Sequence, residues 1–291
     1  MKLKKIGFIG IGNMGFHMAY HLIKKKYDVY PYDKINKNLE IFQNKYLKKN
    51  KNFLTSIKEL DCIILMVPSS REVSDIIFKQ LKLYKIMKKG SIIIDMSTSI
   101  PTETVKIGNK LNKFHIKFLD CPVAGGVKFA KTAGLTLFLG SRSINKNLKQ
   151  LLNVFGKIIW CGNLGSGHSI KALNNFINAS TLNTYLEAIT TALKFGIPKK
   201  NLISAIDSAT TGKNNPYLKK IKLGILKNKL NSGFTINLLA KDVNIARNLI
   251  NKFTKKPLVS SNILKILNAS KYKLGKNSDQ LNLYKMWSSK I

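Results

Sequence analysis

Apolar and polar residues follow each other along the first 160 residues in the rhythm of a parallel sheet with crossover helices. Residues 62–67 and 92–94 are apolar throughout, as expected for strands that are covered on both faces. Helical spacing of apolar residues begins near residues 14, 38, 73, 102 and 145. The strands that this pattern predicts are residues 4–9, 28–32, 61–67, 91–95, 117–119, 135–139 and 157–160.

The pattern changes after residues 165–167, where strand signals end and apolar residues recur at helical spacing. Residues 170–195 contain neither proline nor glycine, which predicts one long helix of about 39 Å at 1.5 Å per residue. We therefore expect an α/β domain over residues 1–162 and an all-α substrate and dimerisation domain over residues 163–291, opened by this helix. Further helices are expected over residues 199–209, 236–253, 258–272 and 280–286.

Lysine dominates the charge of the chain, which has 50 Lys+Arg residues against 14 Asp+Glu and a formal net charge of +36. Arg71, Arg142 and Arg247 are the only arginines, and the lysines are spread along the whole chain. Base readout and bidentate phosphate contacts favour arginine, so we interpret the charge as a composition bias and expect no specific nucleic-acid partner. Such a surface still attracts anionic substrates.

Cysteines and histidines suggest neither a disulfide framework nor a metal site. Cys62, Cys121 and Cys161 are odd in number and far apart, and the i,i+4 pair of His17 and His21 has no carboxylate nearby. No apolar run reaches the roughly 20 residues that a membrane-spanning helix needs. The N-terminal residues lack the apolar stretch of a signal peptide, so we expect a soluble, cytoplasmic protein without a membrane partner.

A glycine-rich segment follows the first predicted strand and opens a helix. In this context the first glycine allows a tight turn, the second lets a pyrophosphate approach the backbone, and the third lets helix and strand pack closely. The N–H groups at the start of the helix favour phosphate. We therefore expect a Rossmann-type doubly wound sheet that binds a dinucleotide with Gly10, Ile11, Gly12, Asn13, Met14 and Gly15.

Asp33 follows the second predicted strand, 23 residues after the first glycine. A carboxylate at this place binds the ribose hydroxyls of NAD and repels the 2′-phosphate of NADP. Lys34 and Lys37 come next and can tolerate a 2′-phosphate. The sequence therefore favours NAD as the cofactor and does not exclude NADP.

Together with Phe8-Ile9 before it and Met18-Ala19 after it, the glycine segment resembles the opening of the β-hydroxyacid dehydrogenases. This family includes 3-hydroxyisobutyrate dehydrogenase, tartronate semialdehyde reductase and L-threonate dehydrogenase. Three further blocks, residues 120–127, 165–175 and 234–242, resemble the family in the same order and extend the resemblance over nearly the whole chain. The resemblance implies hydride transfer between NAD and a short β-hydroxyacid.

The second block contains Ala124, Gly125 and Gly126, which the resemblance identifies as a substrate-binding segment. Successive small residues can present backbone N–H groups to an anion, which suits a substrate carboxylate. Most family members have serine where this chain has Ala124. That difference removes a hydroxyl donor and leaves the identity of the substrate open.

The third block places Lys171 and Asn175 four residues apart, on one face of the long helix. The resemblance implies that Lys171 is the catalytic general acid/base and that Asn175 binds substrate. Burial and a neighbouring cation both lower the pKa of a lysine, so this residue type suits proton transfer near neutral pH.

The fourth block contains Lys241, which the resemblance places at both cofactor and substrate, and Asp242, which we expect to orient local structure. Val67, Pro68 and Thr98 follow strands of the predicted sheet. Open α/β sheets bind ligands at the carboxyl ends of their strands, so these residues are expected at the cofactor. The resemblance puts Thr98 beside the nicotinamide.

The resemblance favours a dehydrogenase for 3-hydroxyisobutyrate or a similar hydroxycarboxylate. L-threonate or another sugar-acid-like substrate is an alternative, because residues 126–128 resemble that branch; reduction of an aldehyde acid of the tartronate semialdehyde type is another. A non-catalytic module that binds cofactor or nucleic acid is a hypothesis of a different class. A homodimer or homotetramer is expected, because the long helix is apolar on more than one face around Ile177, Leu182, Leu186 and Ile189.

Overall fold

Five parallel strands form the central sheet, in the order β2-β1-β3-β4-β5. The chain leaves β1 for β2 on one side and returns to β3 on the other, so the strand order reverses beside β1. Open sheets bind ligands at such a switch point, directly beyond the carboxyl ends of the strands. The strands are β1 (Lys5–Ile9), β2 (Asp28–Tyr32), β3 (Cys62–Leu65), β4 (Ile92–Asp95) and β5 (Lys117–Asp120).

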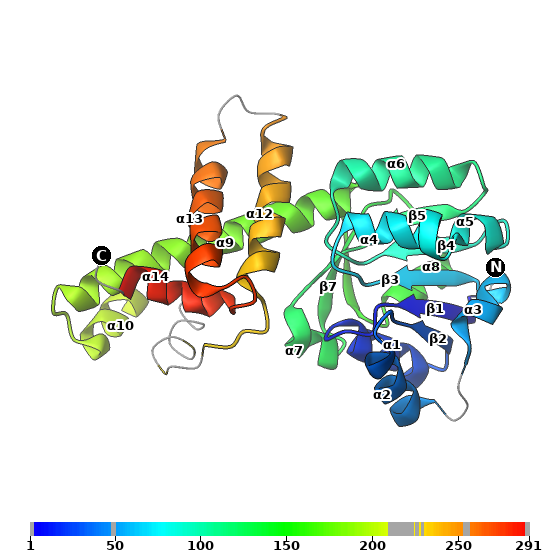
Figure 1. Ribbon diagram of the computed structural model, residues 1–291, viewed down its shortest axis with the longest axis horizontal. Coiled ribbons are helices and arrows are strands. Elements are labelled where there is room, and N and C mark those ends of the chain that lie inside the picture. Colours follow the sequence, from blue (N-terminus) through cyan, green and yellow to red (C-terminus); the bar gives the residue numbers. More distant parts are fainter. Residues whose placement is uncertain are drawn as a thin grey trace. The chain divides into compact units, whose positions relative to one another are not determined.

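Helices cover both faces of this sheet, as the apolar strands predicted (Figure 1). Ile6, Phe8 and Ile64 pack on the side of α1, α2 and α8, whereas Ile9 and Ile63 pack on the side of α4, α5 and α6. The doubly wound fold is thereby confirmed. The helices are α1 (Gly15–Lys24), α2 (Asn36–Tyr46), α3 (Phe53–Ser56), η1 (Ile57–Glu59), α4 (Ser70–Asp75), η2 (Ile76–Gln80), α5 (Leu83–Ile86), α6 (Pro101–Asn112), α7 (Gly126–Lys131) and α8 (Lys146–Leu152).

The last two predicted strands belong to a second sheet, so the expectation of one parallel sheet for all seven strands was wrong. This sheet has the order β6-β7-β8, with β6 (Val123–Ala124) antiparallel and β8 (Gly156–Trp160) parallel to β7 (Leu135–Leu139). Pro122, which has no N–H donor, separates β5 from β6. An isolated antiparallel bridge between Asp120 and Gly140 connects the last residue of β5 with the residue that follows β7.

Helix starts are set by local chemistry that the sequence contains. Pro101 opens α6 at a position where its missing N–H costs nothing. Asn145 caps α8 by accepting a hydrogen bond from Leu148 N at 2.9 Å. Thr235 caps α12 (Ile236–Ile250) in the same way.

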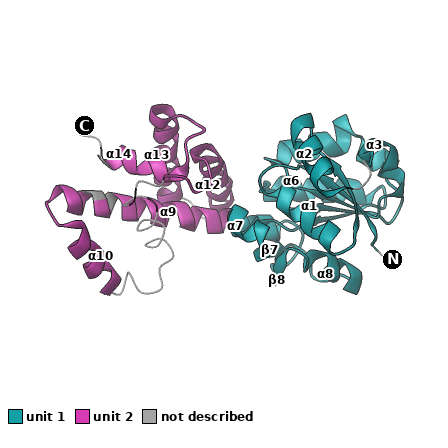
Figure 2. Cartoon of the chain, turned by 90° about the horizontal axis from the view of Figure 1, so that it is seen from below, with its two compact units in different colours: residues 1–171 teal, residues 172–291 magenta. Residues whose placement is uncertain are grey.

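The structure describes residues 3–47, 51–208, 224, 227, 230–252 and 257–288. The chain divides into two compact units, residues 1–171 and 172–291, shown in teal and magenta in Figure 2. The second unit is helical where it is described, and the last residues of two predicted helices, Ala209 and Phe253, lie outside the described residues. Its helices are the greater part of α9 (Ser166–Lys194), α10 (Lys199–Ser208), α12, α13 (Leu258–Leu274), η4 (Gln280–Leu283) and α14 (Tyr284–Ser288).

The apolar residues of α9 were expected to contact a second copy of the chain, but most of those named pack within the second unit. Leu182, Leu186 and Ile189 are buried in the core of the second unit, together with residues of α10, α12 and α13, so they give no evidence of a second copy of the chain. Ile177 is 60% exposed. The homodimer or homotetramer stays a prediction.

Among the described residues, no helix is long and apolar enough to cross a membrane. Within the same residues, no three His, Cys, Asp or Glu side chains come together in a group that could hold a metal ion. His21 instead contacts the carbonyl oxygens of Ala130 and Lys131 with its Nε2 atom, at 3.0 and 3.1 Å.

Candidate functional site

The three glycines in the turn between β1 and α1 differ in how much space surrounds them. Gly10 has a φ of +97°, and a Cβ there would lie 2.2 Å from the carbonyl oxygen of Met66. A Cβ at Gly15 would lie 1.8 Å from the carbonyl oxygen of Gly10. A Cβ at Gly12 would meet nothing within 4 Å. Packing within the chain therefore requires the first and third glycines, whereas open space lies beside the second.

The N-terminus of α1 fits a phosphate group. Met14 occupies the N-cap position and its side chain makes no capping hydrogen bond, and the first turn contains no acidic residue. The first N–H groups of a helix lack partners within the helix and carry the positive end of its dipole. Together with the space at Gly12, this arrangement fits the pyrophosphate of a dinucleotide.

Asp33 is bonded directly to the glycine turn. Its Oδ2 atom accepts a hydrogen bond from Ile11 N at 2.7 Å, and its Oδ1 atom accepts one from Ile35 N at 2.8 Å. The half-buried carboxylate retains further lone pairs, because an ionised carboxyl can accept about four hydrogen bonds. Asp33 therefore both supports the turn and is suited to bind ribose hydroxyls.

The connections after β3 and β4 are tied together at the same edge of the sheet. Val67 N donates to Ser97 Oγ at 3.0 Å, and Ser97 N donates to Asp95 Oδ1 at 2.9 Å. Pro68 lies in the first of these connections and Thr98 in the second. The three residues predicted to contact the cofactor thus lie where open sheets bind ligands.

A buried polar network holds the beginning of α9. Asp120 Oδ1 accepts a hydrogen bond from Gly165 N at 2.8 Å, and its Oδ2 accepts one from His168 N at 2.9 Å. The His168 Nδ1 atom lies 2.7 Å from Thr104 Oγ1. Burial raises the pKa of Asp120 above its usual value, although His168 and the two N–H donors act against this shift.

The sequence indicated no role for Asp120, Thr104 or His168 in the site. The one available signal is that Asp120 begins the second block and His168 lies within the third. Lys171 is half-buried and lies three residues after His168. The network therefore fixes the helical turn from which Lys171 projects.

Ala124, Gly125 and Gly126 join β6 to α7. Ala124 pairs with Thr136 of β7, which holds the segment against the second sheet. Gly125 and Gly126 have φ values of +124° and +68°, and both glycines are exposed. Consecutive residues in such unusual conformations can aim several N–H groups at one anion, as predicted for the substrate carboxylate.

In the second unit, Asp242 contacts two predicted site residues, Asn175 and Lys241. From the sequence, Asp242 was expected only to orient local structure. Asn175 Nδ2 donates to Asp242 Oδ2 at 2.6 Å, and Lys241 Nζ lies 3.1 Å from Asp242 Oδ1. Asn175 and Asp242 are 6% and 2% exposed. Asp242 therefore orients Asn175 of α9 through a hydrogen bond and forms an ion pair with Lys241, its neighbour on α12.

Two family models match adjoining parts of the chain. Residues 5–163 match the NAD binding domain of 6-phosphogluconate dehydrogenase. Residues 165–287 match the model described as NAD-binding of NADP-dependent 3-hydroxyisobutyrate dehydrogenase. The two matches meet between β8 and the start of α9.

Named relatives are similar over most of the chain. The mitochondrial 3-hydroxyisobutyrate dehydrogenase of Rattus norvegicus is 30% identical over 89% of this chain and 79% of its own length. The 2-(hydroxymethyl)glutarate dehydrogenase of Eubacterium barkeri is 28% identical over 83% and 81%. The structure of Mycobacterium tuberculosis 3-hydroxyisobutyrate dehydrogenase with L-serine matches 99% of this chain and 100% of its own, with a TM-score of 0.86 and 22% identity. At that identity the structural likeness concerns the fold.

Proposed function

Because this chain belongs to the β-hydroxyacid dehydrogenase family that includes 3-hydroxyisobutyrate dehydrogenase, we propose that it oxidises a short β-hydroxyacid, with 3-hydroxyisobutyrate as the first candidate. Membership of this family makes the protein a 3-hydroxyacid dehydrogenase that binds NAD(P). The observation that supports the proposal is that Asp120 holds the first turn of α9, the helix on which Lys171 lies about one turn before Asn175. The alternatives are L-threonate and aldehyde acids of the tartronate semialdehyde type.

The residues that hold the cofactor in this proposal are those of the glycine turn, with Asp33 at the ribose and Thr98 beside the nicotinamide. Val67, Pro68 and Lys241 are further cofactor-binding residues. NAD, when bound, supplies the acceptor for the hydride that leaves the carbinol carbon. Asp33 favours NAD over NADP through its charge, while Lys34 and Lys37 leave NADP use possible.

Lys171 is the general acid/base of the proposed reaction. Its neutral amine takes the hydroxyl proton from the substrate as the hydride leaves, and its ammonium returns that proton in the reverse direction. Asn175, oriented by Asp242, donates a hydrogen bond to the substrate. The backbone N–H groups of residues 124–126 bind the carboxylate, without the hydroxyl that a serine would add at Ala124.

A screen of short β-hydroxyacids with NAD, and with NADP as the control, tests this function. We expect 3-hydroxyisobutyrate, or a similar hydroxyacid such as L-threonate, to reduce NAD. The initial rate is measured from the rise in absorbance of the reduced cofactor at about 340 nm. Salt-sensitive DNA binding with no oxidation of any hydroxyacid would instead favour the non-catalytic module. Light scattering measures the predicted homodimer or homotetramer directly, and the cytoplasmic location stays a prediction.

Asp33→Ser should raise the use of NADP relative to NAD by about 10- to 100-fold, the size of one or two lost contacts to a charged group. The reason is that the 2′-phosphate no longer meets a carboxylate at the end of β2. Glu40→Ser is the matched control, because exposed Glu40 on α2 carries the same charge outside the turn. Equal effects of the two variants on the NADP/NAD ratio of kcat/KM would contradict the role given to Asp33.

Asp242→Asn should lower kcat/KM by about 10- to 100-fold, because Asn175 and Lys241 lose their charged partner. Asp279→Asn is the control, since Asp279 accepts hydrogen bonds from Ser232 and Leu281 in the same unit. Both variants should lose some stability in urea unfolding. A purely structural role for Asp242 predicts equal kcat/KM values for the two folded variants, which would overturn its positioning role.

A further inference from the structure

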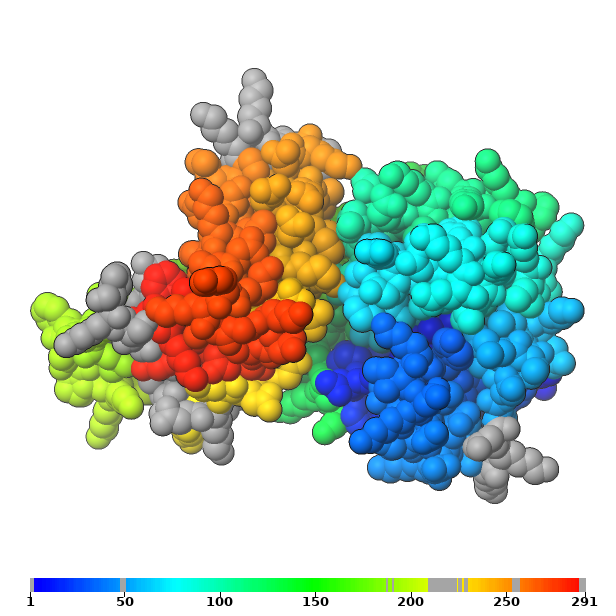
Figure 3. Space-filling view, viewed as in Figure 1, coloured from blue at the N-terminus to red at the C-terminus, as the bar shows by residue number. Residues whose placement is uncertain are grey.

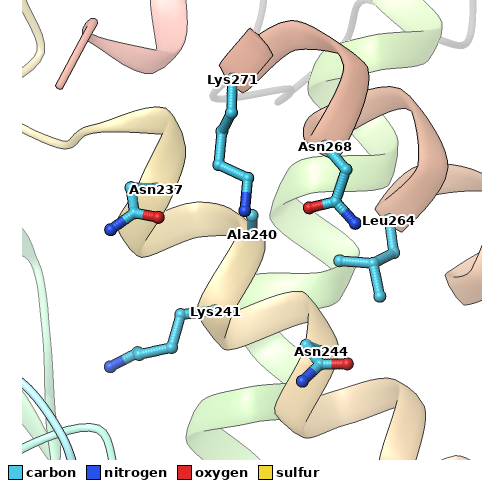
Figure 4. Close-up of a pocket in the computed structure, with 7 residues that line it drawn as sticks. All are labelled: Asn237, Ala240, Lys241, Asn244, Leu264, Asn268 and Lys271. Carbon is cyan, nitrogen blue, oxygen red and sulfur yellow. The ribbon is translucent and has the colours of Figure 1, made fainter. Parts of the chain in front are cut away.

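A pocket in the second unit and a buried group in the first unit each bring polar side chains together. The pocket, of about 270 Å³, lies between α12 and α13, which run side by side (Figures 1 and 3). Each polar side chain that lines it, such as Lys241 or Lys271 in Figure 4, is exposed or half-buried. Water and salt screen exposed charges, so this pocket does not require a bound ion. The buried group has no such screening.

The buried group consists of Asp95, Asp120 and His168, which we call the His168 cluster. Asp95 ends β4, Asp120 ends β5, and the two residues pair with each other across these strands. His168 Nε2 lies 3.7 Å from Asp95 Oδ2, and His168 Nδ1 lies 3.9 Å from Asp120 Oδ2. Each of the three residues is at most 1% exposed. The histidine therefore lies between two carboxylates that are closed off from solvent.

The ring of His168 is oriented by a neighbouring hydroxyl group. Thr104 Oγ1 lies 2.7 Å from His168 Nδ1 and 3.1 Å from the carbonyl oxygen of Ile100. Among the described residues, Nε2 has no hydrogen-bond partner, and it faces the Asp95 carboxylate. An ionised carboxylate only accepts hydrogen bonds, so this arrangement is favourable when Nε2 carries a hydrogen. The attraction between Nε2–H and Asp95 is strengthened by their burial.

Asp95 holds the loop of residues 96–100, in which Thr98 lies. Its Oδ1 atom accepts a hydrogen bond from Ser97 N at 2.9 Å, and its Oδ2 atom accepts one from Ser99 Oγ at 2.7 Å. Both serines are buried, and Thr98, which is proposed to lie beside the nicotinamide, stands between them in the chain. The position of Thr98 therefore depends on the Asp95 carboxylate.

Asp120 holds the start of the helix that carries Lys171. Its two oxygens accept hydrogen bonds from Gly165 N and His168 N. His168 is thus bonded to Asp120 through its backbone and faces Asp95 with its ring. The cluster, the loop and Lys171 all belong to the first compact unit, residues 1–171.

We propose that His168 is a positioning residue, which couples the loop of Thr98 to the start of α9 and so keeps the nicotinamide aligned with Lys171. The hydride acceptor and the proton acceptor must both be correctly placed, because a misplacement of about 1 Å can lower a rate about 100-fold. This inference rests on the proposed function and adds to it a residue that acts through Asp95 and Asp120.

His168→Gln and His168→Asn form a matched pair of variants. The amide nitrogen of glutamine reaches about as far from the backbone as Nε2, whereas that of asparagine reaches only as far as Nδ1. We expect His168→Gln to keep most of the wild-type kcat. His168→Asn should lower kcat by about 10- to 100-fold, up to the cost of a misplacement of about 1 Å. Equal kcat values for the two folded variants would overturn the coupling.

The Kd of NAD separates positioning from a general loss of structure. Calorimetry should give a Kd close to the wild-type value for both variants, because the proposed dinucleotide site is built on the glycine turn and Asp33. A fall in kcat at unchanged Kd supports the inference. If His168→Asn weakens NAD binding as much as it lowers kcat, the residue has a structural role and the inference is wrong.

The wild-type protein itself tests the contact with Asp95. NMR of the His168 ring nitrogens shows which of them carries a hydrogen. We expect a hydrogen on Nε2, the atom that faces Asp95 Oδ2. A lone pair on Nε2 would place two acceptors face to face, and this result would remove the contact on which the coupling depends.

Hydrogen exchange tests the coupling without any reaction. His168→Asn should speed the exchange of Ser97 N–H, which donates to Asp95, by about 10-fold, the size of one weakened buried hydrogen bond. Asp61→Asn is the control, because Asp61 accepts hydrogen bonds from Lys4 N and Lys5 N at the opposite ends of the strands. This control should leave the exchange of Ser97 unchanged.

The two proposals can fail separately in these experiments. If no hydroxyacid is oxidised but Ser97 exchanges faster in His168→Asn and not in Asp61→Asn, the proposed function fails and the coupling stands. If the wild-type protein oxidises a hydroxyacid, and His168→Asn changes neither kcat nor the exchange of Ser97, the inference fails and the proposed function stands.

Discussion

Lys171→Ala should lower kcat by about 10²- to 10⁴-fold, the range that a positioned general acid/base contributes. Binding of NAD should stay close to that of the wild-type protein, because the proposed dinucleotide site is built on β1, α1 and Asp33. The substrate alcohol loses its proton acceptor in this variant, while the groups that bind its carboxylate remain. Stopped-flow measurement of NAD reduction, together with calorimetric titration of NAD, gives both quantities.

Lys194→Ala is the matched control for this experiment. Lys194 is the last residue of α9, about 34 Å along the helix axis from Lys171 at 1.5 Å per residue. The control should retain the wild-type kcat. Added primary amines should restore part of the activity of Lys171→Ala, since they replace the missing proton acceptor. A wild-type kcat in Lys171→Ala would remove this residue from the mechanism.

Gly12→Val should weaken NAD binding by about 100-fold, the upper part of the range that overpacking costs, and leave the fold intact. A Cβ at Gly12 meets nothing within 4 Å, so the added side chain starts in the open space proposed for the pyrophosphate. Thermal melting should give a Tm close to that of the wild-type protein. Calorimetry with NAD measures the lost affinity.

Gly15→Ala provides the opposite case within the same turn. Its added Cβ would lie 1.8 Å from the carbonyl oxygen of Gly10, so β1 and α1 must separate to make room. The main effect of this variant should be a lower free energy of unfolding, which prevents a separate measurement of any effect on NAD binding. If Gly12→Val instead bound NAD with wild-type affinity, the glycine turn would not be the dinucleotide site.

Local chemistry explains why much of the first unit could be predicted from the sequence. The bounds of β2 and β7 agree with the prediction residue for residue, because both strands are short runs with clear ends. The Asp33 carboxylate was placed beside the glycine turn because a fixed spacing in a strand–helix–strand unit brings them together. Patterns within about 30 residues carry this information.

Contacts between residues far apart in the chain could not be predicted in the same way. His168 and Asp120 are 48 positions apart, and Asn175 and Asp242 are 67 apart, so no periodicity connects them. The pattern also could not separate burial within one chain from burial against a second copy. Leu182 and Leu186 are buried within one chain, although their apolar character was interpreted as a sign of contact with a second copy.

Transfer of deuterium is the measurement that tests the central claim most directly. 3-Hydroxyisobutyrate, or the best substrate of the screen, is prepared with deuterium on the carbinol carbon and oxidised with unlabelled NAD. We predict that mass spectrometry finds one deuterium in the reduced cofactor, and that Lys171→Ala slows this transfer without redirecting it. Deuterium that appears in the solvent, with none in the cofactor, would contradict hydride transfer by this protein.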